Sequence, residues 1–165
     1  MTDSIILTNE QIIHKTKRIA YQILESNTNE SKVILAGICG NGIIFAERLK
    51  KVIEQICDLK VVLCEVNINK KNPLDTISTS IPAAEYTDQS LVLVDDVLNS
   101  GTTLIYGVKH FLEVPLKRFK TVVLVNRNHK KYPVKADFKG ISMSTSILEH
   151  IRVEFTEDSS VAYLC

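Results

Sequence analysis

The chain has 165 residues, of which 45% are hydrophobic and 24% charged, an ordinary composition for one folded domain with a sizeable core. Its formal net charge of +1 excludes a strong overall field that would favour nucleic acid or a membrane surface. The apolar runs are too short to span a bilayer, the N-terminal MTDSIILTNE lacks the regions of a signal peptide, and the four cysteines form no C-x-x-C pair, so we expect a cytoplasmic protein.

The first predicted element is a helix over residues 9–26. Thr8 is a suitable N-cap, and Gln11, three residues later, completes a capping box. Apolar residues then recur at helical spacing until the polar sequence SNTNES ends the helix. We expect this helix to pack on a sheet and to carry no chemistry.

A short buried strand over residues 33–36 leads into a loop with three glycines in six residues, 37–42, and then into a helix of about four turns. Such a loop can cradle a phosphate because glycine lets the backbone approach a ligand closely. The spacing is neither the dinucleotide-binding fingerprint nor a Walker loop. The loop alone therefore leaves phosphate binding and a plain connection open.

A third strand is predicted over residues 60–68. The following segment, 69–86, contains two prolines and little periodicity. A loop of this length inside a compact domain is usually a lid or a disordered segment. We therefore expect a mobile loop over about residues 69–86.

The stretch LVLVDDVLNSGTT, residues 91–103, holds the chain's strongest functional pattern. A buried strand is predicted over residues 91–94, and Asp95 and Asp96 follow where it ends. The polar turn after them opens a helix, at the sheet edge where open α/β sheets bind ligands. A helix N-terminus suits a phosphate, and two carboxylates can bind sugar hydroxyls or Mg²⁺. The pattern favours a pocket for a phosphorylated sugar over the alternative, a β-turn-α junction whose acids only cap a helix.

Pro115 ends that helix, and residues 119–126 predict a fifth strand. The alternation of strands and helices predicts a single α/β domain over residues 1–165, with an open, mostly parallel sheet and helices on both faces. Residues 132–165 do not continue this alternation of strands and helices, and they contain two strand-like runs, IRVEF and VAYLC. We expect them to form a small C-terminal hood at the carboxyl edge of the sheet.

Residues 91–103 resemble the phosphoribosyl diphosphate (PRPP) signature of type I phosphoribosyltransferases, in which a hydrophobic strand and two acids precede a Ser/Thr-Gly-Thr turn. The resemblance implies that Asp95 and Asp96 are catalytic, meet the ribose hydroxyls and hold Mg²⁺ directly or through water. It also assigns the other ligand contacts. In this assignment, the residues that bind the 5′-phosphate are Asn99, Ser100, Gly101, Thr102 and Thr103, and those that bind the pyrophosphate are Ile38, Cys39, Gly40 and Asn41. In the same assignment, Lys70 or Lys71 of the mobile loop supplies positive charge to the leaving pyrophosphate.

The C-terminal part of the chain, residues 132–154 (the tail), strengthens the resemblance. The string YPVKADFKG, followed by Thr145-Ser146 and IRVE, looks like the tail of the bifunctional pyrimidine operon attenuator/uracil phosphoribosyltransferases. The resemblance places Lys135 at the base, although taken alone Lys135 would more often be a surface lysine. It implies a homo-oligomeric enzyme that transfers 5-phosphoribosyl from PRPP to a nucleobase, uracil before a purine, and releases pyrophosphate.

Two positions depart from the resembled families. The hypoxanthine-guanine enzymes carry an aspartate where this chain has Asn99, and an amide cannot take up a proton, which favours a pyrimidine. The attenuator enzymes have Thr-Arg-Gly where this chain has Gly40-Asn41-Gly42. Loss of such a charge-assisted contact costs about 1.5 to 3 kcal/mol.

Two alternatives therefore stay open. The first is a regulator that senses PRPP or a nucleotide and binds RNA without significant turnover. The basic residues argue against RNA binding, because they are dispersed along the chain and offset by acids. The second is an inactive protein that keeps the fold, for which Asn41 and Asn99 are the argument.

Overall fold

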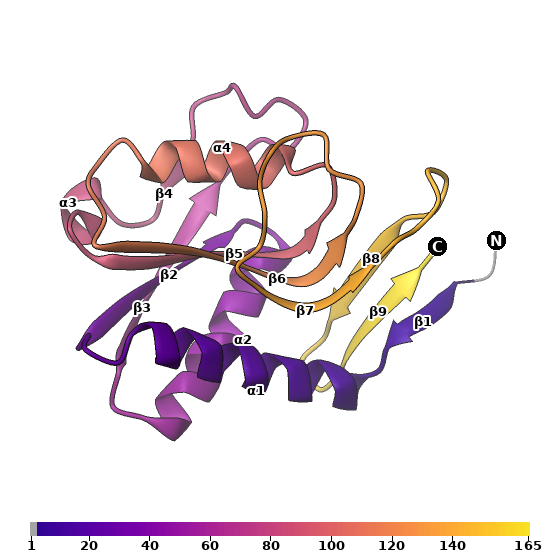
Figure 1. Cartoon of the computed structure of the whole chain (residues 1–165), viewed down its shortest axis with the longest axis horizontal. Coiled ribbons are helices and arrows are strands. Elements are labelled where there is room, and N and C mark those ends of the chain that lie inside the picture. Colours follow the sequence, from indigo (N-terminus) through magenta and orange to yellow (C-terminus); the bar gives the residue numbers. More distant parts are fainter. Residues whose placement is uncertain (1–2) are drawn as a thin grey trace.

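Two β-sheets organise the computed structural model, which describes residues 3–165 (Figure 1). The larger sheet has six strands in the order β4-β3-β2-β5-β6-β7, and the smaller has three in the order β1-β9-β8. The strands of the larger sheet are β2 (Lys32–Ile38), β3 (Lys60–Asn67), β4 (Ser78–Thr79), β5 (Ser90–Leu98), β6 (Arg118–Arg127) and β7 (Phe138–Met143). Those of the smaller sheet are β1 (Ser4–Leu7), β8 (Ile151–Phe155) and β9 (Ser160–Leu164).

The order of the strands determines where a ligand crevice can form. All neighbours in the larger sheet are parallel except the short β4, which pairs antiparallel with β3. From β2 at the centre, the chain moves outward to β3 on one side and later to β5, β6 and β7 on the other. Ligands bind at such a switch point, outside the carboxyl ends of the strands. In this chain it lies between the ends of β2 and β5.

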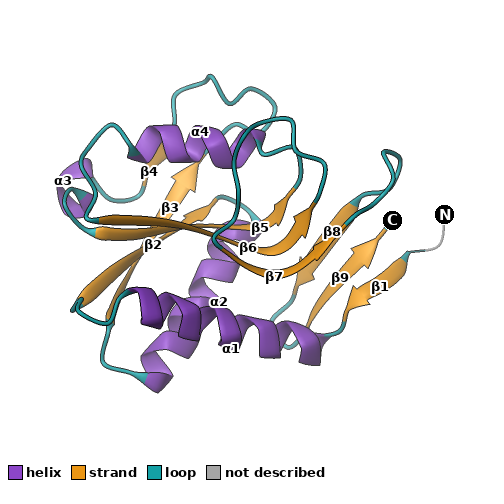
Figure 2. Cartoon of the chain, viewed as in Figure 1, coloured by secondary structure: helices purple, strands orange, loops and turns teal. Residues whose placement is uncertain are grey.

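Helices cover both faces of the larger sheet, as the sequence predicts (Figure 2). Helices α1 (Asn9–Ser26) and α2 (Asn41–Ile56) lie on one face, and α3 (Ala83–Tyr86) and α4 (Thr102–Phe111) on the other. The predicted capping box is present, since Gln11 N–H donates to Thr8 Oγ1 at 3.3 Å and Thr8 N–H to Gln11 Oε1 at 2.9 Å. No helix within residues 3–165 has the length and apolar character needed to cross a membrane.

The expected hood over residues 132–165 differs from what the structure shows. Strand β7 pairs in parallel with β6 and is the edge of the larger sheet, so residues 138–143 do not belong to a separate subdomain. The smaller sheet instead combines β8 and β9 with β1, which comes from the N-terminal end of the chain. Leu7 of β1 is buried in the core cluster with residues of α1 and α2, and this burial stabilises β1 in its position beside β9.

The expected loop over residues 69–86 is also shorter than predicted. Its second half contains β4 and α3, and α3 ends at the buried Tyr86. The Tyr86 ring meets the ring of Phe111 edge-on, with centroids 5.1 Å apart, which fixes this half against α4. The irregular part therefore lies between β3 and β4, over residues 68–77, and it includes Lys70 and Lys71.

Candidate active site

The acidic pair lies inside β5, which continues to Leu98 instead of ending at residue 94. Asp95 is only 4% exposed, whereas Asp96 is partly exposed. Asp95 Oδ1 accepts the Asp96 N–H at 2.9 Å, and Asp96 Oδ1 accepts the Val97 N–H at 2.9 Å. The two carboxylates are therefore held by the backbone of their own strand, in unequal surroundings.

The surroundings of Asp95 disfavour its charge. Burial, and then repulsion from Asp96, raise the pKa of Asp95 from 3.8 to about 8, although Lys70 acts in the opposite direction. This raised pKa favours the protonated Asp95 carboxyl in the unliganded protein. A cation bound beside it would favour the ionised form.

The predicted phosphate turn lies between β5 and α4. Ser100 Oγ accepts the Thr102 N–H at 3.3 Å and lies 2.8 Å from Thr102 Oγ1. Gly101 has a φ of 85°, and a Cβ added to it would lie 2.6 Å from Val134 Cγ1, so this position requires glycine. Helix α4 begins at Thr102, and its first-turn N–H groups and positive dipole end lie at the turn.

These predicted residues share one pocket. It is lined by the acidic pair, by the whole turn, by Lys70, and by apolar side chains that the sequence pattern did not identify. The complete lining is Lys70, Asp95, Asp96, Val97, Leu98, Asn99, Ser100, Gly101, Thr102, Thr103, Leu104 and Val123. Val123 lies in the predicted strand over residues 119–126, and the register that places it opposite Asp95 is seen only in the structure.

Lys70 covers the pocket from the loop between β3 and β4. Its Nζ lies 3.9 Å from Asp95 Oδ1, and its side chain is 47% exposed. Lys71 is exposed and does not line the pocket. The cavity beside Lys70 has a volume of about 110 Å³, smaller than the several hundred Å³ typical of small-molecule pockets.

The glycine-rich loop lies beside the acidic pair. Cys39 ties it to β3, because its N–H donates to Val66 O at 2.9 Å. A Cβ on Gly42 would lie 2.8 Å from Val94 O and 3.2 Å from Asp95 Oδ1, so glycine allows α2 to begin against the end of β5. The side chain of Asn41 completes the contact by donating to Asp96 Oδ2 at 2.9 Å.

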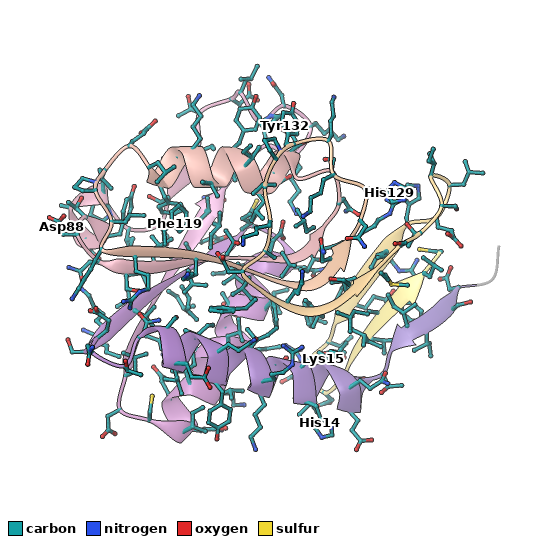
Figure 3. The ribbon with its side chains drawn as sticks, viewed as in Figure 1. His14, Lys15, Asp88, Phe119, His129 and Tyr132 are labelled. Atoms are coloured by element: carbon teal, nitrogen blue, oxygen red, sulfur yellow. The ribbon has the colours of Figure 1, made fainter. Side chains whose placement is uncertain are left out.

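The tail lies on the phosphate turn, but Lys135 does not line the pocket. The N–H groups of Lys131 and Tyr132 donate to Ser100 O at 2.7 and 3.1 Å. Figure 3 shows Tyr132 at the end of α4 where the helix begins, and its ring lies 6.3 Å from that of Tyr106. Lys135 is exposed. Its contact with a base stays a prediction.

The donor set limits how a divalent cation could bind. Asp95 and Asp96 offer carboxylate oxygens, the ligands that Mg²⁺ prefers. Among residues 3–165 there is no group of three or more histidine, cysteine, aspartate or glutamate side chains that could hold a metal by itself. The pair therefore suits a Mg²⁺ whose remaining ligands come from water and from a substrate.

Comparison with known proteins agrees with this geometry. Residues 3–158 match the family described as the phosphoribosyl transferase domain. "Bifunctional protein PyrR" of Streptococcus pneumoniae is 33% identical over 143 residues, which cover 85% of this chain and 83% of that protein.

Two solved structures show the same fold. The hypoxanthine phosphoribosyltransferase of Trypanosoma cruzi superposes with a TM-score of 0.77 at 16% identity, covering 96% of this chain and 95% of that one. A hypoxanthine-guanine phosphoribosyltransferase of Bacillus anthracis gives 0.74 at 20% identity, covering 90% and 86%. The chain therefore belongs to the phosphoribosyl transferase domain family, has the type I fold and is a phosphoribosyltransferase.

Proposed function

We propose that this enzyme transfers the 5-phosphoribosyl group of PRPP to a ring nitrogen of a nucleobase, with uracil favoured, and releases pyrophosphate. The observation that carries the proposal is the single pocket shared by Asp95, Asp96, Lys70 and the turn 99–103. The turn offers donors for the 5′-phosphate, the acids offer acceptors for the ribose hydroxyls, and Lys70 offers charge for the leaving pyrophosphate.

The reaction breaks the bond between the ribose C1 and the pyrophosphate oxygen and forms a bond from C1 to the base nitrogen, whose proton is released. Positive charge develops on the ribose carbon, as in glycoside cleavage. Ionised carboxylates at Asp95 and Asp96 would stabilise this charge, and Lys70 would stabilise the leaving group. Mg²⁺ held by the same two acids, directly or through water, would balance the diphosphate charge.

The preference for uracil rests on two residues. Asn99 lies exposed at the start of the turn, and its amide cannot take up a proton from a purine ring. Lys135 can donate to an exocyclic oxygen, which uracil has and adenine lacks.

The decisive assay supplies PRPP and Mg²⁺ with uracil, hypoxanthine, guanine, adenine or xanthine and measures pyrophosphate release. We expect turnover with uracil above all others. Isothermal titration with PRPP and Mg²⁺ should show binding to the native protein and its loss in Asp95→Asn/Asp96→Asn. Equal titrations of the two proteins would refute the proposed site.

The role of Lys135 has its own test. Lys135→Ala should raise the apparent KM for uracil by about tenfold or more, because a site built around a donor discriminates strongly when that contact is missing. The KM for PRPP should change little, since its contacts are on residues 95–103. Lys139→Ala, at another exposed lysine nearby, is the control. Equal kinetics for both variants would place Lys135 in solvent.

Binding of RNA is the second candidate, because residues 132–154 resemble the tail of the operon attenuators and the Streptococcus pneumoniae relative is named bifunctional. The net charge of +1 argues against it, since RNA binding usually needs a concentrated basic surface. Filter binding across a salt series discriminates, because phosphate contacts give a steep salt dependence. We further propose a cytoplasmic homo-oligomer, which light scattering coupled to gel filtration can measure.

A further inference from the structure

The side chain of Asn41 joins three elements of the molecule. It is the first residue of α2, and its Nδ2 donates to Asp96 Oδ2 of β5 at 2.9 Å and to Val153 O of β8 at 2.8 Å. An amide nitrogen carries two hydrogens. Both are therefore used within the protein, one on the acidic pair and one on the smaller sheet.

The contact completes the support of the Asp96 carboxylate. Asp96 Oδ1 already accepts the Val97 N–H at 2.9 Å, so Asn41 gives the second oxygen a fixed donor as well. Each carboxylate oxygen has a further acceptor position, which leaves capacity for a ligand. A carboxylate held at both oxygens keeps one orientation toward the pocket.

The contact with β8 gives a hydrogen-bond donor to a backbone carbonyl on the edge of the smaller sheet. Strand β8 is the edge of the smaller sheet, with β9 as its only strand neighbour among the described residues. An edge strand presents carbonyl groups without a strand partner. Val153 is only 4% exposed, and the Asn41 amide gives its carbonyl the partner that a buried backbone group requires.

The flanking glycines allow this arrangement. A Cβ on Gly42 would crowd Val94 O, and Gly40 has a φ of 89° at the start of α2. Any larger residue at 42 would push the start of α2 away from β5 and would lengthen the bond from Asn41 to Asp96. The local sequence Gly-Asn-Gly thus brings a neutral donor against the acidic pair.

We propose that Asn41 is a positioning residue that orients the Asp96 carboxylate for the ribose of PRPP and fastens the edge of the smaller sheet to the active site. This inference rests on the proposed function only where Asp96 meets PRPP. A positioning role differs from direct binding of pyrophosphate by the Asn41 amide, because both amide hydrogens already donate to groups of the protein. The side chain acts on the substrate through Asp96.

The contact itself can be tested without turnover. The side-chain amide of Asn41 is observed by ¹⁵N NMR in the ligand-free protein and is assigned by its loss in Asn41→Asp. In Asp96→Asn we expect its resonances to shift and its amide hydrogens to exchange faster with solvent, because one acceptor has lost its charge. The amide of the exposed Asn67 should be unaffected. An unchanged Asn41 signal would overturn the proposal.

A double-mutant cycle tests the positioning role. By titration with PRPP and Mg²⁺, Asn41→Ala should weaken binding about tenfold, which corresponds to about 1.4 kcal/mol. In the Asp96→Asn background, Asn41→Ala should add little, because residues that act through one another are not additive. Asn67→Ala is the control. Full, independent losses from the two substitutions would show that Asn41 binds PRPP directly and would overturn the proposal.

Other outcomes separate the inference from the proposed function. Asn41→Asp has nearly the same shape but faces Asp96 with a second carboxylate, so it should lose more PRPP affinity than Asn41→Ala. A smaller loss would contradict the proposal. If the native protein does not bind PRPP, the proposed function fails, and the NMR experiment alone then decides whether Asn41 holds Asp96.

Discussion

The two acids of the site are chemically different residues. Asp95 is buried and its pKa is raised to about 8, whereas Asp96 is partly exposed and held by Asn41 and Val97. The sequence predicted the pair but not this difference. Burial of Asp95 depends on how closely α2 approaches β5, and that approach depends on Gly42, which no spacing rule connects to the pair.

The raised pKa of Asp95 predicts a pH dependence of stability. As the pH rises from about 4 to about 8, the unfolded chain loses the Asp95 proton while the folded protein keeps it. The free energy of unfolding therefore falls over this window, by up to about 1.4 kcal/mol per pH unit. Asp95→Asn cannot ionise and should remove this contribution.

The measurement is urea unfolding of both proteins at several pH values between 5 and 8, without ligand or divalent cation. The exposed Asp58→Asn is the control and should follow the native curve. Parallel curves for native protein and Asp95→Asn would show that Asp95 titrates normally.

Lys70 should matter for activity far more than for stability. Its Nζ lies 3.9 Å from Asp95 Oδ1 and its side chain is 47% exposed, so this contact is weak and Lys70→Ala should change the free energy of unfolding by less than about 1 kcal/mol. Loss of a charge-assisted contact to pyrophosphate should lower kcat/KM by about tenfold to a hundredfold. Initial rates and thermal midpoints test this. Lys71→Ala removes a lysine that lies outside the pocket, so this control variant should keep native rates.

At the scale of elements, local pattern was sufficient wherever an element is long or regular. The helix predicted over residues 9–26 has those bounds, and its capping box is present. Three strands were missed, β1, β7 and the two-residue β4, and they lack such a signal. Strand β1 has four residues and pairs with β9 at the far end of the chain, and β7 contains a glycine and lies at a sheet edge. Such short runs give too little apolar alternation for a strand to be predicted from the sequence.

The turn between β5 and α4 gives a prediction for Gly101. Gly101→Ala must adopt a φ of 85° and bring its Cβ within 2.6 Å of Val134 Cγ1. The left-handed backbone costs about 1 to 2 kcal/mol, and the contact adds to it. Thermal or urea unfolding should show both contributions. Val134→Ala removes the side chain that the new Cβ would meet, so Gly101→Ala should cost less in the Val134→Ala background than in the native protein. Equal costs in both backgrounds would mean that residue 134 moves aside freely.

At the scale of the whole molecule, the candidate active site lies where two sheets meet. The larger sheet supplies the acidic pair and the phosphate turn, and the smaller sheet reaches them through α2. The sequence predicted a hood from the end of the chain alone. It could not show that the N-terminal β1 completes the smaller sheet, or that a backbone carbonyl of Val153 meets Asn41, since a carbonyl is common to every residue.

Arg48 of α2 should provide the main polar contacts that hold the smaller sheet against α2. Its guanidinium donates to Ser160 Oγ at 2.5 Å and to Thr156 O at 2.6 Å, and it lies 4.8 Å from the centre of the Phe155 ring. A lysine cannot reproduce this forked, stacked contact. We expect Arg48→Lys to lower the free energy of unfolding by about 1 to 2 kcal/mol.

Urea unfolding measures that loss, with Lys51→Arg at an exposed position of the same helix as the control. The effect should also reach the active site, because a looser β8 weakens the hold of Val153 on Asn41 and thereby the orientation of Asp96. PRPP affinity should therefore fall in Arg48→Lys although Arg48 does not line the pocket. Lost stability with native PRPP affinity would show that the smaller sheet supports the fold without influencing the acidic pair.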